Sequence, residues 1–437
     1  MIALPLDEVR ELAKGELTFA PGETAATGVR IDSRLVEPGD LFVAVGRGRE
    51  FVREARERGA VATLVPEEPF AALAAIGRAV RARSRARVVG ITGSTAKTST
   101  KDILGALCAP HARTVVAEGS QNNEIGLPLT LCRLEDDTEV AIVEMGMRGL
   151  GQIAELCAIA RPDIGVITKI GPVHLELLGT IERVAEAKAE LVAALPAGGT
   201  AIVPAADPYL EPHLRRTDVE IVRFGPEGGV RLLDFRPDGD RSELTIEVFG
   251  ERQTIEFSFN SRHNAENALA ATAAYDALGL PLSRLAAGAG AVRLSRWRGE
   301  EVELPGGGIL INDAYNANPL SMVAALEHLA DRAGGRRKLA ILGDMAELGP
   351  AGPGYHRDVG AAAGRACVDV LVAVGPLSRG YVDGAEDVPV TRWTATVDEG
   401  LAAARDLLRP GDAVLVKGSR AMGLEAVAEA LAVVPVL

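Results

Sequence analysis

Residues 88–101 carry the side chains of this chain that are best suited to chemistry. The apolar run 88–91 predicts a short buried strand, and the segment that starts at Lys97 has helical spacing. A tight loop between a strand and a helix directs backbone N–H groups and the helix N-terminus at an anion. In such a phosphate-binding loop Lys97 would reach the outer phosphates of a nucleotide, and the Thr98 hydroxyl would hold Mg²⁺. The alternative is an ordinary turn rich in Ser and Thr.

One position departs from the phosphate-loop pattern G-x-x-x-x-G-K-[ST]. Gly90 fills the first glycine position and Gly93 lies inside the loop, but Ala96 stands where the second glycine is expected. A residue with a Cβ in the left-handed conformation costs roughly 1–2 kcal/mol. We therefore expect the loop to fold and to bind a nucleotide more weakly than a loop with Gly at this position. The predicted nucleotide contacts in this loop are Gly93, Ser94, Thr95, Ala96, Lys97, Thr98 and Ser99.

Three more side chains come from the predicted strand–helix units that follow. Glu144 comes directly after the apolar strand 139–143, where a carboxylate can hold Mg²⁺ opposite the loop hydroxyl; the alternative is a solvated Glu. His174 follows the strand 164–168, at the sheet edge where ligands bind in parallel α/β folds, although a structural His is an equal alternative. Lys188 lies in a helix between acidic residues, and the residues alone favour an exposed ion pair.

Amide and guanidinium side chains supply further candidates. Asn264 and Asn267 precede an Ala-rich helix. Asn can cap a helix, and it can also read an amide-like base edge because it both donates and accepts hydrogen bonds. Arg298 lies near a predicted domain boundary, where it could stabilise a transferring phosphoryl group when the domains close; Arg293 and Arg296 are competing candidates.

Length and composition favour a multi-domain protein that does not act on nucleic acid. The 437 residues are enough for about two to four domains, and the net charge of −13 argues against a nucleic-acid partner. No apolar run approaches the roughly 18 residues of a membrane span, and the N-terminus lacks the pattern of a signal peptide. The scattered cysteines form no C-x-x-C motif and indicate buried, reduced thiols in a cytoplasmic protein, which we expect to be a monomer. They are Cys108, Cys132, Cys157 and Cys367.

Lysine is rare among the 47 basic residues, because the chain uses Arg wherever a generic positive charge is sufficient. Lys has a compact ammonium group and an amine that can be modified, and Arg has neither. Each retained Lys is therefore a candidate for chemistry that Arg cannot do. The lysines are Lys14, Lys97, Lys101, Lys169, Lys188, Lys338 and Lys417.

The order of predicted elements indicates an α/β protein with three domains, 1–82, 83–299 and 300–437. The first is a small N-terminal α/β domain. The second is a central P-loop domain whose alternating strands and helices predict a doubly wound parallel sheet, with a more β-like region over 215–258. The third is a C-terminal Rossmann-like α/β domain that again has polar residues at its strand ends. The basic segment 81–87 is the predicted linker between the first two domains.

Several motifs in one order resemble the Mur ligases, the ATP-dependent amide ligases that build the peptide stem of peptidoglycan. The resemblance covers nearly the whole chain. Its general motifs are residues 93–98, 122–126, 144–146, 170–176, 187–190 and 263–267. The motifs that resemble the family member adding D-alanyl-D-alanine are residues 313–319, 342–349, His356 and 416–420.

The resemblance implies a reaction and its substrates. ATP would phosphorylate the terminal carboxylate of UDP-N-acetylmuramoyl-tripeptide to an acyl phosphate, and the amine of D-alanyl-D-alanine would then displace phosphate. Two alternatives stay open: a Mur-type ligase with another amino-acid acceptor, and a non-catalytic homologue that binds a nucleotide-linked peptide, with Ala96 marking the lost activity.

The resemblance also implies residue roles in a magnesium–nucleotide site. Lys97 and Thr98 match the phosphate and magnesium residues, and Glu144 and His174 match metal-site residues. The remaining implied nucleotide contacts are Asn264 on the adenine side, Arg298 on the phosphate side and Asp313 on the ribose.

Lys188 matches the lysine that the family carbamylates. A bare ammonium group would repel Mg²⁺, whereas its CO₂ adduct is an anion that can ligate or orient the metal. Arg cannot form that adduct easily. The implied residues of the substrate side are Ser33, Arg34, Asn122, Asn123, Asn316 and Asn318.

Overall fold

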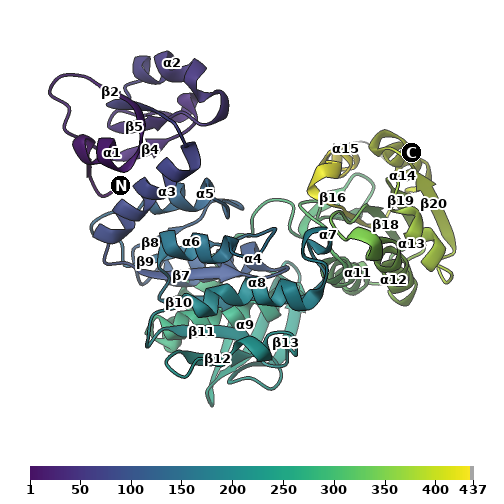
Figure 1. The fold of residues 1–437 in the computed structure, drawn as a ribbon. Helices are drawn as coiled ribbons and strands as arrows, with labels where there is room; N and C mark the ends of the chain where they lie inside the picture. Colours follow the sequence, from purple (N-terminus) through teal and green to yellow (C-terminus); the bar gives the residue numbers. More distant parts are fainter. Residues whose placement is uncertain (434–437) are drawn as a thin grey trace.

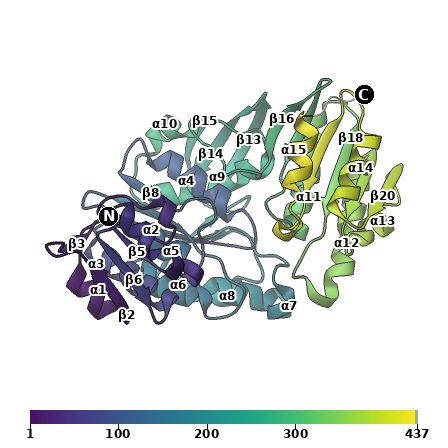
Figure 2. The ribbon, with the colours of Figure 1, turned by 90° about the horizontal axis from the view of Figure 1, so that it is seen from above.

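Two large sheets of nine and six strands and a smaller one of four strands form the framework of the computed structural model, which describes residues 1–433. The smaller N-terminal part and the C-terminal part lie on different sides of the central part (Figures 1 and 2). The predicted α/β fold class is confirmed. Among the described residues, no helix has both the length and the apolar character that a membrane span requires.

The N-terminal part is a four-stranded sheet in the order β2-β6-β5-β4 with helices packed against it. Strand β4 ends at Arg30, and the Asp32 carboxylate then accepts the backbone N–H of Arg34 and starts a 3₁₀ turn at Ser33–Leu35. Its elements are β1 (Leu4–Pro5), α1 (Leu6–Leu12), β2 (Gly15–Phe19), β3 (Ala25–Ala26), β4 (Gly28–Arg30), β5 (Asp40–Val43), α2 (Val52–Glu57), β6 (Ala62–Pro66) and α3 (Pro69–Arg83).

The central sheet has the strand order β15-β14-β13-β12-β11-β10-β7-β9-β8. The strands from β8 to β12 are parallel, and the β-like region 215–258 supplies the antiparallel strands at the other edge. Its strands are β7 (Arg87–Thr92), β8 (Thr114–Val116), β9 (Val140–Glu144), β10 (Ile164–Ile167), β11 (Thr200–Pro204), β12 (Glu220–Phe224), β13 (Val230–Asp238), β14 (Arg241–Val248) and β15 (Glu251–Phe257). Its helices are α4 (Lys97–Cys108), α5 (Gly126–Leu131), α6 (Gln152–Ala160), α7 (Leu175–Leu178), α8 (Ile181–Ala193), α9 (Arg262–Ala277) and α10 (Ala286–Ala289).

Helices cover both faces of the parallel region, which explains why its strands are apolar on both sides. Side chains alternate along each strand, so Val88 joins the core beneath α6 and α8, while Val89 joins the core beneath α4 and α9. The Ala-rich sequence of α9 lets that helix pack closely against α4 and the sheet. This packing fixes the N-terminus of α4 at the carboxyl edge of the sheet.

The C-terminal sheet has the order β16-β17-β21-β18-β19-β20, and every pair except β16–β17 is parallel. Apolar cores again lie on both faces. Its strands are β16 (Glu300–Leu304), β17 (Gly308–Asn312), β18 (Lys338–Gly343), β19 (Val370–Val374), β20 (Val390–Thr394) and β21 (Ala413–Lys417). Its helices are α11 (Pro319–Ala333), α12 (Gly352–Arg365), α13 (Arg379–Gly384), α14 (Val397–Leu407) and α15 (Glu425–Val433).

The segment between α10 and β16 connects the two large sheets and is anchored to the start of α4. The backbone N–H and the hydroxyl of Ser295 donate to the Asp102 carboxylate at 2.7 and 2.8 Å. Trp297 and Gly299 then adopt positive φ angles of 60° and 76°, which turn the chain. The turn presents Arg298, which lies between them, to the phosphate loop.

The prediction that all four cysteines are buried is wrong for one of them. Cys108, Cys132 and Cys157 are buried free thiols, and burial raises the pKa of each to about 12. Cys367 is exposed, because it follows the C-terminus of α12 at a left-handed φ of 52°.

Candidate active site

The loop between β7 and α4 has the backbone geometry of an anion site. Gly93 has a φ of 153°, and a Cβ at this position would lie 1.9 Å from the Thr168 hydroxyl, so only Gly fits. Thr168 donates from Oγ1 to the Thr95 carbonyl at 2.6 Å, and the Lys97 ammonium donates to the Gly93 carbonyl at 2.9 Å. These contacts hold the loop closed over the N-terminus of α4, where backbone N–H groups face an arriving anion.

Ala96 adopts the conformation for which the phosphate-loop pattern requires Gly. It is the N-cap residue of α4, with φ 67° and ψ −5°, and its side chain makes no cap hydrogen bond. Helix α4 begins at Lys97, directly after this residue, although Ala96 has a Cβ. The departure at this position adds backbone strain without removing the loop geometry.

Glu144 ends β9 and lies directly against the phosphate loop. Its side chain is buried, with Oε2 accepting from the Thr98 hydroxyl at 2.8 Å and Oε1 accepting from the Asn122 amide at 2.7 Å. The alternative prediction, that Glu144 is a solvated side chain, is therefore wrong. A carboxylate and a hydroxyl now lie together beside the loop, as a magnesium site requires.

Lys188 is buried, so the exposed ion pair that its helix neighbours favoured is wrong. The residue is 2% exposed, and its side-chain amine makes no hydrogen bond or ion pair within residues 1–433. The neighbouring Glu190 instead accepts the backbone N–H groups of Gly151 and Ala154 at 2.6 and 3.0 Å. Burial and the nearby charge of Lys97 hold the pKa of the Lys188 amine well below its usual value. A neutral amine is the form that can react with CO₂.

His174 lies just before α7 and also faces the cavity beside Lys188. Burial lowers the pKa of its imidazole, while its contact with Glu347 opposes that shift. The contact joins Nδ1 of the ring to Oε2 of Glu347, which lies in the C-terminal part. The Glu347 partner was not predicted.

The side chains on this edge fit a magnesium ion that arrives with a nucleotide. Within residues 1–433, no group of three or more His, Cys, Asp or Glu side chains could hold a metal by itself. Magnesium takes few protein ligands and fills its shell with phosphate oxygens and water. Thr98, Glu144 and His174 supply hard or borderline donors beside the loop.

A cavity of about 1240 Å³ lies between the central and C-terminal parts. Its volume exceeds the upper end of the roughly 300–1,000 Å³ usual for small-molecule pockets, so it has room for a nucleotide and part of a second substrate. The predicted site residues that line it are Ser94, Thr95, Ala96, Lys97, Thr98, Ser99, Asn122, Asn123, Glu144, His174, Lys188, Arg298, Asp313, Asn316 and Asn318.

A few predicted residues do not line this cavity. Asn264 is buried, donates to the Ser261 hydroxyl and accepts from the Asn267 amide. Other residues of α9, including Asn267, line the cavity in its place. Ser33 and Arg34 lie on the N-terminal part, where they pair with acidic side chains of that part. A smaller cavity of about 520 Å³ lies between Ile31 and residues 118–129.

Of the three candidate arginines, Arg298 is the one that reaches the phosphate loop. Its Nη2 donates to the Thr98 hydroxyl at 2.8 Å, and its guanidinium carbon lies 4.1 Å from the centre of the Tyr315 ring. Its buried Nε has no hydrogen-bond partner among the described residues. Arg293 bonds locally to Val292, and Arg296 pairs with Glu429.

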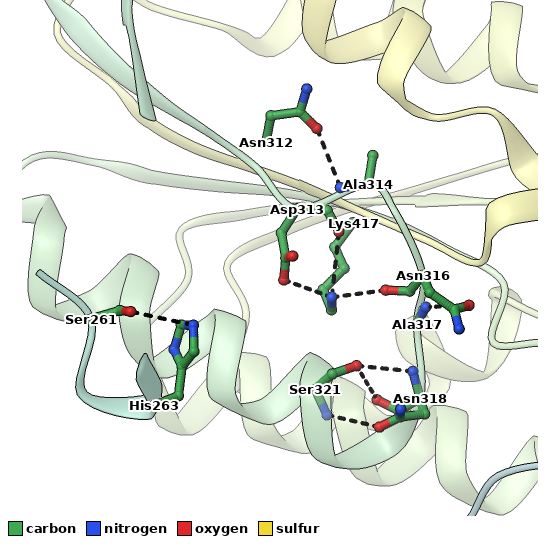
Figure 3. Close-up of polar contacts among 10 residues, drawn as sticks. All are labelled: Ser261, His263, Asn312, Asp313, Ala314, Asn316, Ala317, Asn318, Ser321 and Lys417. Atoms are coloured by element: carbon green, nitrogen blue, oxygen red, sulfur yellow. Dashed lines mark hydrogen bonds and ion pairs between the residues drawn. The ribbon is translucent and has the colours of Figure 1, made fainter. Parts of the chain in front are cut away.

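Lys417 was predicted only as one of the retained lysines, without a specific partner, and it organises the loop after β17 (Figure 3). Its buried ammonium donates to the Asp313 carboxylate at 2.6 Å and to the Asn316 carbonyl at 2.9 Å. The same loop ends at Asn318, whose amide caps α11 and donates to the Ser94 carbonyl at 3.4 Å. The signal that could have identified this residue is a Lys at the end of a predicted strand in a chain that has few lysines.

Comparison with known proteins gives the class to which this arrangement belongs. Residues 91–275 match the model of the Mur ligase middle domain, and residues 297–420 match that of the Mur ligase, glutamate ligase domain. The chain belongs to the Mur ligase family.

The most informative relatives are similar along nearly their whole length. The chain is 33% identical to the UDP-N-acetylmuramoyl-tripeptide--D-alanyl-D-alanine ligase of Bacillus subtilis and 31% identical to that of Escherichia coli, with 99% of each chain covered in both comparisons. Among solved structures, MurF from Acinetobacter baumannii gives a TM-score of 0.86 at 26% identity, covering 98% of both chains. MurF from Thermotoga maritima in complex with ADP gives 0.78 at 27% identity, covering 92% of this chain and 96% of that one.

Proposed function

We propose that this chain is an ATP-dependent ligase that joins D-alanyl-D-alanine to the terminal carboxylate of UDP-N-acetylmuramoyl-tripeptide during synthesis of the peptidoglycan precursor. The observation that carries the proposal is the assembly of Thr98, Glu144, His174 and Lys188 around one cavity, with Arg298 reaching the same loop. The similarity to UDP-N-acetylmuramoyl-tripeptide--D-alanyl-D-alanine ligases over 99% of the chain supports D-alanyl-D-alanine as the acceptor.

The reaction needs activation because a free carboxylate is a poor electrophile. The tripeptide carboxylate attacks the γ-phosphate of ATP, which gives an acyl phosphate and ADP. The amine of D-alanyl-D-alanine then attacks the acyl carbon, and phosphate leaves. Lys97 and Arg298 offset the negative charge on the transferring phosphoryl group, and their contacts with Gly93 and Thr98 fix them beside the loop.

The residues that would bind the metal lie near the end of β9, which carries Glu144, and near Lys188 of α8. A bound Mg²⁺ supplies charge compensation for the phosphoryl oxygens. Thr98, Glu144 and His174 would hold it, and Lys188 would join them as its carbamate. Support for the carbamate comes from burial, from the lowered pKa of the Lys188 amine and from its freedom from other partners within residues 1–433.

The substrate contacts and the division of labour among domains are part of the same proposal. Domain 1–82 binds the UDP end through Ser33 and Arg34, domain 83–299 binds ATP, and domain 300–437 closes over the site and helps to bind the dipeptide. The other implied contacts are Asn264 on the adenine, Asp313 on the ribose, and Asn122, Asn123, Asn316 and Asn318 on the substrates. The enzyme acts as a monomer in the cytoplasm, the compartment that its free cysteines favour.

Phosphate release with defined substrates tests the proposal. Purified protein with ATP and Mg²⁺ should release phosphate only when UDP-N-acetylmuramoyl-tripeptide and D-alanyl-D-alanine are both present. Replacing the dipeptide by glutamate or a diamino acid tests the alternative acceptor. No release at any Mg²⁺ concentration, with any acceptor, would leave the non-catalytic homologue as the better account.

A further inference from the structure

His174 and Glu347 meet across the boundary between the central and C-terminal parts. His174 follows β10 in the central part, and Glu347 follows β18 in the C-terminal part. Nδ1 of His174 and Oε2 of Glu347 are hydrogen-bonded, although the residues are 173 positions apart in the chain. The pairing engages Nδ1, so Nε2 is the ring nitrogen that stays available on the other side of the imidazole.

Glu347 makes further contacts with the central part. Its carbonyl accepts the backbone N–H of Glu176 at 3.1 Å, and its Oε1 lies 3.5 Å from Nη2 of Arg148. The Glu347 side chain is one-third exposed, whereas His174 lines the large cavity. Glu347 is not among the residues that line this cavity, so its carboxylate contacts the ring without joining the groups around Lys188.

Both residues hold a backbone conformation that is unfavourable for a side chain with a Cβ. His174 has a φ of 53° and Glu347 a φ of 62°. Glycine would adopt these angles without strain, and strain of this kind gathers at functional sites. The chain therefore retains an imidazole and a carboxylate where the backbone alone would favour Gly.

We propose that Glu347 is a positioning residue that orients His174 toward the metal side of the site, so that docking of the C-terminal domain completes that side. A histidine that binds a metal usually donates its other ring N–H to a carboxylate or carbonyl, which fixes both tautomer and ring orientation. Here that carboxylate comes from another domain. The inference rests on the proposed function, because it requires a magnesium nucleotide in the cavity.

A simple docking contact is the competing explanation, and metal binding separates the two. Mn²⁺ serves as the probe, with its binding to the complex of the full chain and ADP measured by electron paramagnetic resonance. Glu347→Ala should weaken Mn²⁺ binding roughly 10- to 100-fold. ADP binding in EDTA should stay within twofold of the parent. Glu347→Gln keeps an acceptor oxygen and should restore part of the Mn²⁺ affinity.

Arg148→Gln is the matched control, because it removes the other ion-pair partner of Glu347 and leaves the ring contact. Its Mn²⁺ affinity should equal that of the parent. Unchanged Mn²⁺ binding in Glu347→Ala would overturn the inference, as would equal losses of Mn²⁺ and metal-free ADP binding. If the parent itself bound neither ADP nor Mn²⁺, the proposed function would fail first and this inference with it.

Discussion

Replacing Ala96 by Gly should stabilise the central domain. Ala96 holds φ 67° and ψ −5° at the N-cap of α4, a left-handed conformation. Relief of that conformation is worth roughly 1–2 kcal/mol, and the greater freedom of Gly in the unfolded chain takes back about 0.4–1 kcal/mol. The expected net gain is about 0.5–1 kcal/mol of unfolding free energy, or roughly 1–4 °C in the melting temperature of a domain of this size.

Differential scanning calorimetry on the full chain measures this change. Ala106→Gly is the matched control, because Ala106 lies in the last turn of the same helix with ordinary helical backbone. There the same substitution should lower stability by about 1 kcal/mol. Suppose that Ala96→Gly melts at or below the temperature of the parent while Ala106→Gly melts at a lower temperature, as expected. That result would show that Ala96 is not strained.

The parent and Ala96→Gly also test whether Ala in place of the loop Gly abolishes nucleotide binding. The loop geometry is retained with Ala, so isothermal titration should detect ATP binding in both the parent and Ala96→Gly. Binding in Ala96→Gly alone would favour the non-catalytic homologue.

Three further changes have defined outcomes. Lys188→Ala should abolish phosphate release, and an added short-chain carboxylate should partly restore it; full activity in the variant would rule out the role of Lys188. Lys417→Met leaves the Asp313 carboxylate without its donor and should cost about 1–3 kcal/mol of C-terminal domain stability in urea unfolding, whereas an unchanged midpoint would contradict the anchoring role. Burial and the nearby His328 lower the pKa of His263 from 6.5 to about 3, so the folded state binds fewer protons than the unfolded state between these values. Stability should therefore fall as the pH drops through this window, and less steeply in His263→Gln; parallel curves would refute the assignment.

The phosphate loop could be predicted from sequence because its pattern is local. A strand, a loop of small residues and a Lys-Thr pair are contiguous, and the structure builds them as β7 and the start of α4. The position of Glu144 also followed from a general rule, since the carboxyl ends of parallel strands share one edge of the sheet. The Thr98–Glu144 contact lies at that edge.

Burial and contacts between domains could not be predicted in the same way. Acidic neighbours made Lys188 look exposed, but its side of α8 packs toward the sheet, which only the tertiary arrangement determines. Glu347 reaches His174 because two sheets dock against each other, and no local spacing encodes that contact. Lys417 was conspicuous as a rare Lys, yet its partner Asp313 lies on the neighbouring strand end and was identified only through its own motif.

Transfer of oxygen from the peptide to phosphate reports on activation of the tripeptide carboxylate by ATP. The tripeptide substrate, labelled with ¹⁸O in its terminal carboxylate, is converted with ATP and D-alanyl-D-alanine, and the released phosphate is analysed by mass spectrometry. Activation of the carboxylate in the cavity around Lys97 predicts one ¹⁸O atom in each phosphate released. Phosphate without ¹⁸O, formed together with the ligated product, would contradict the account.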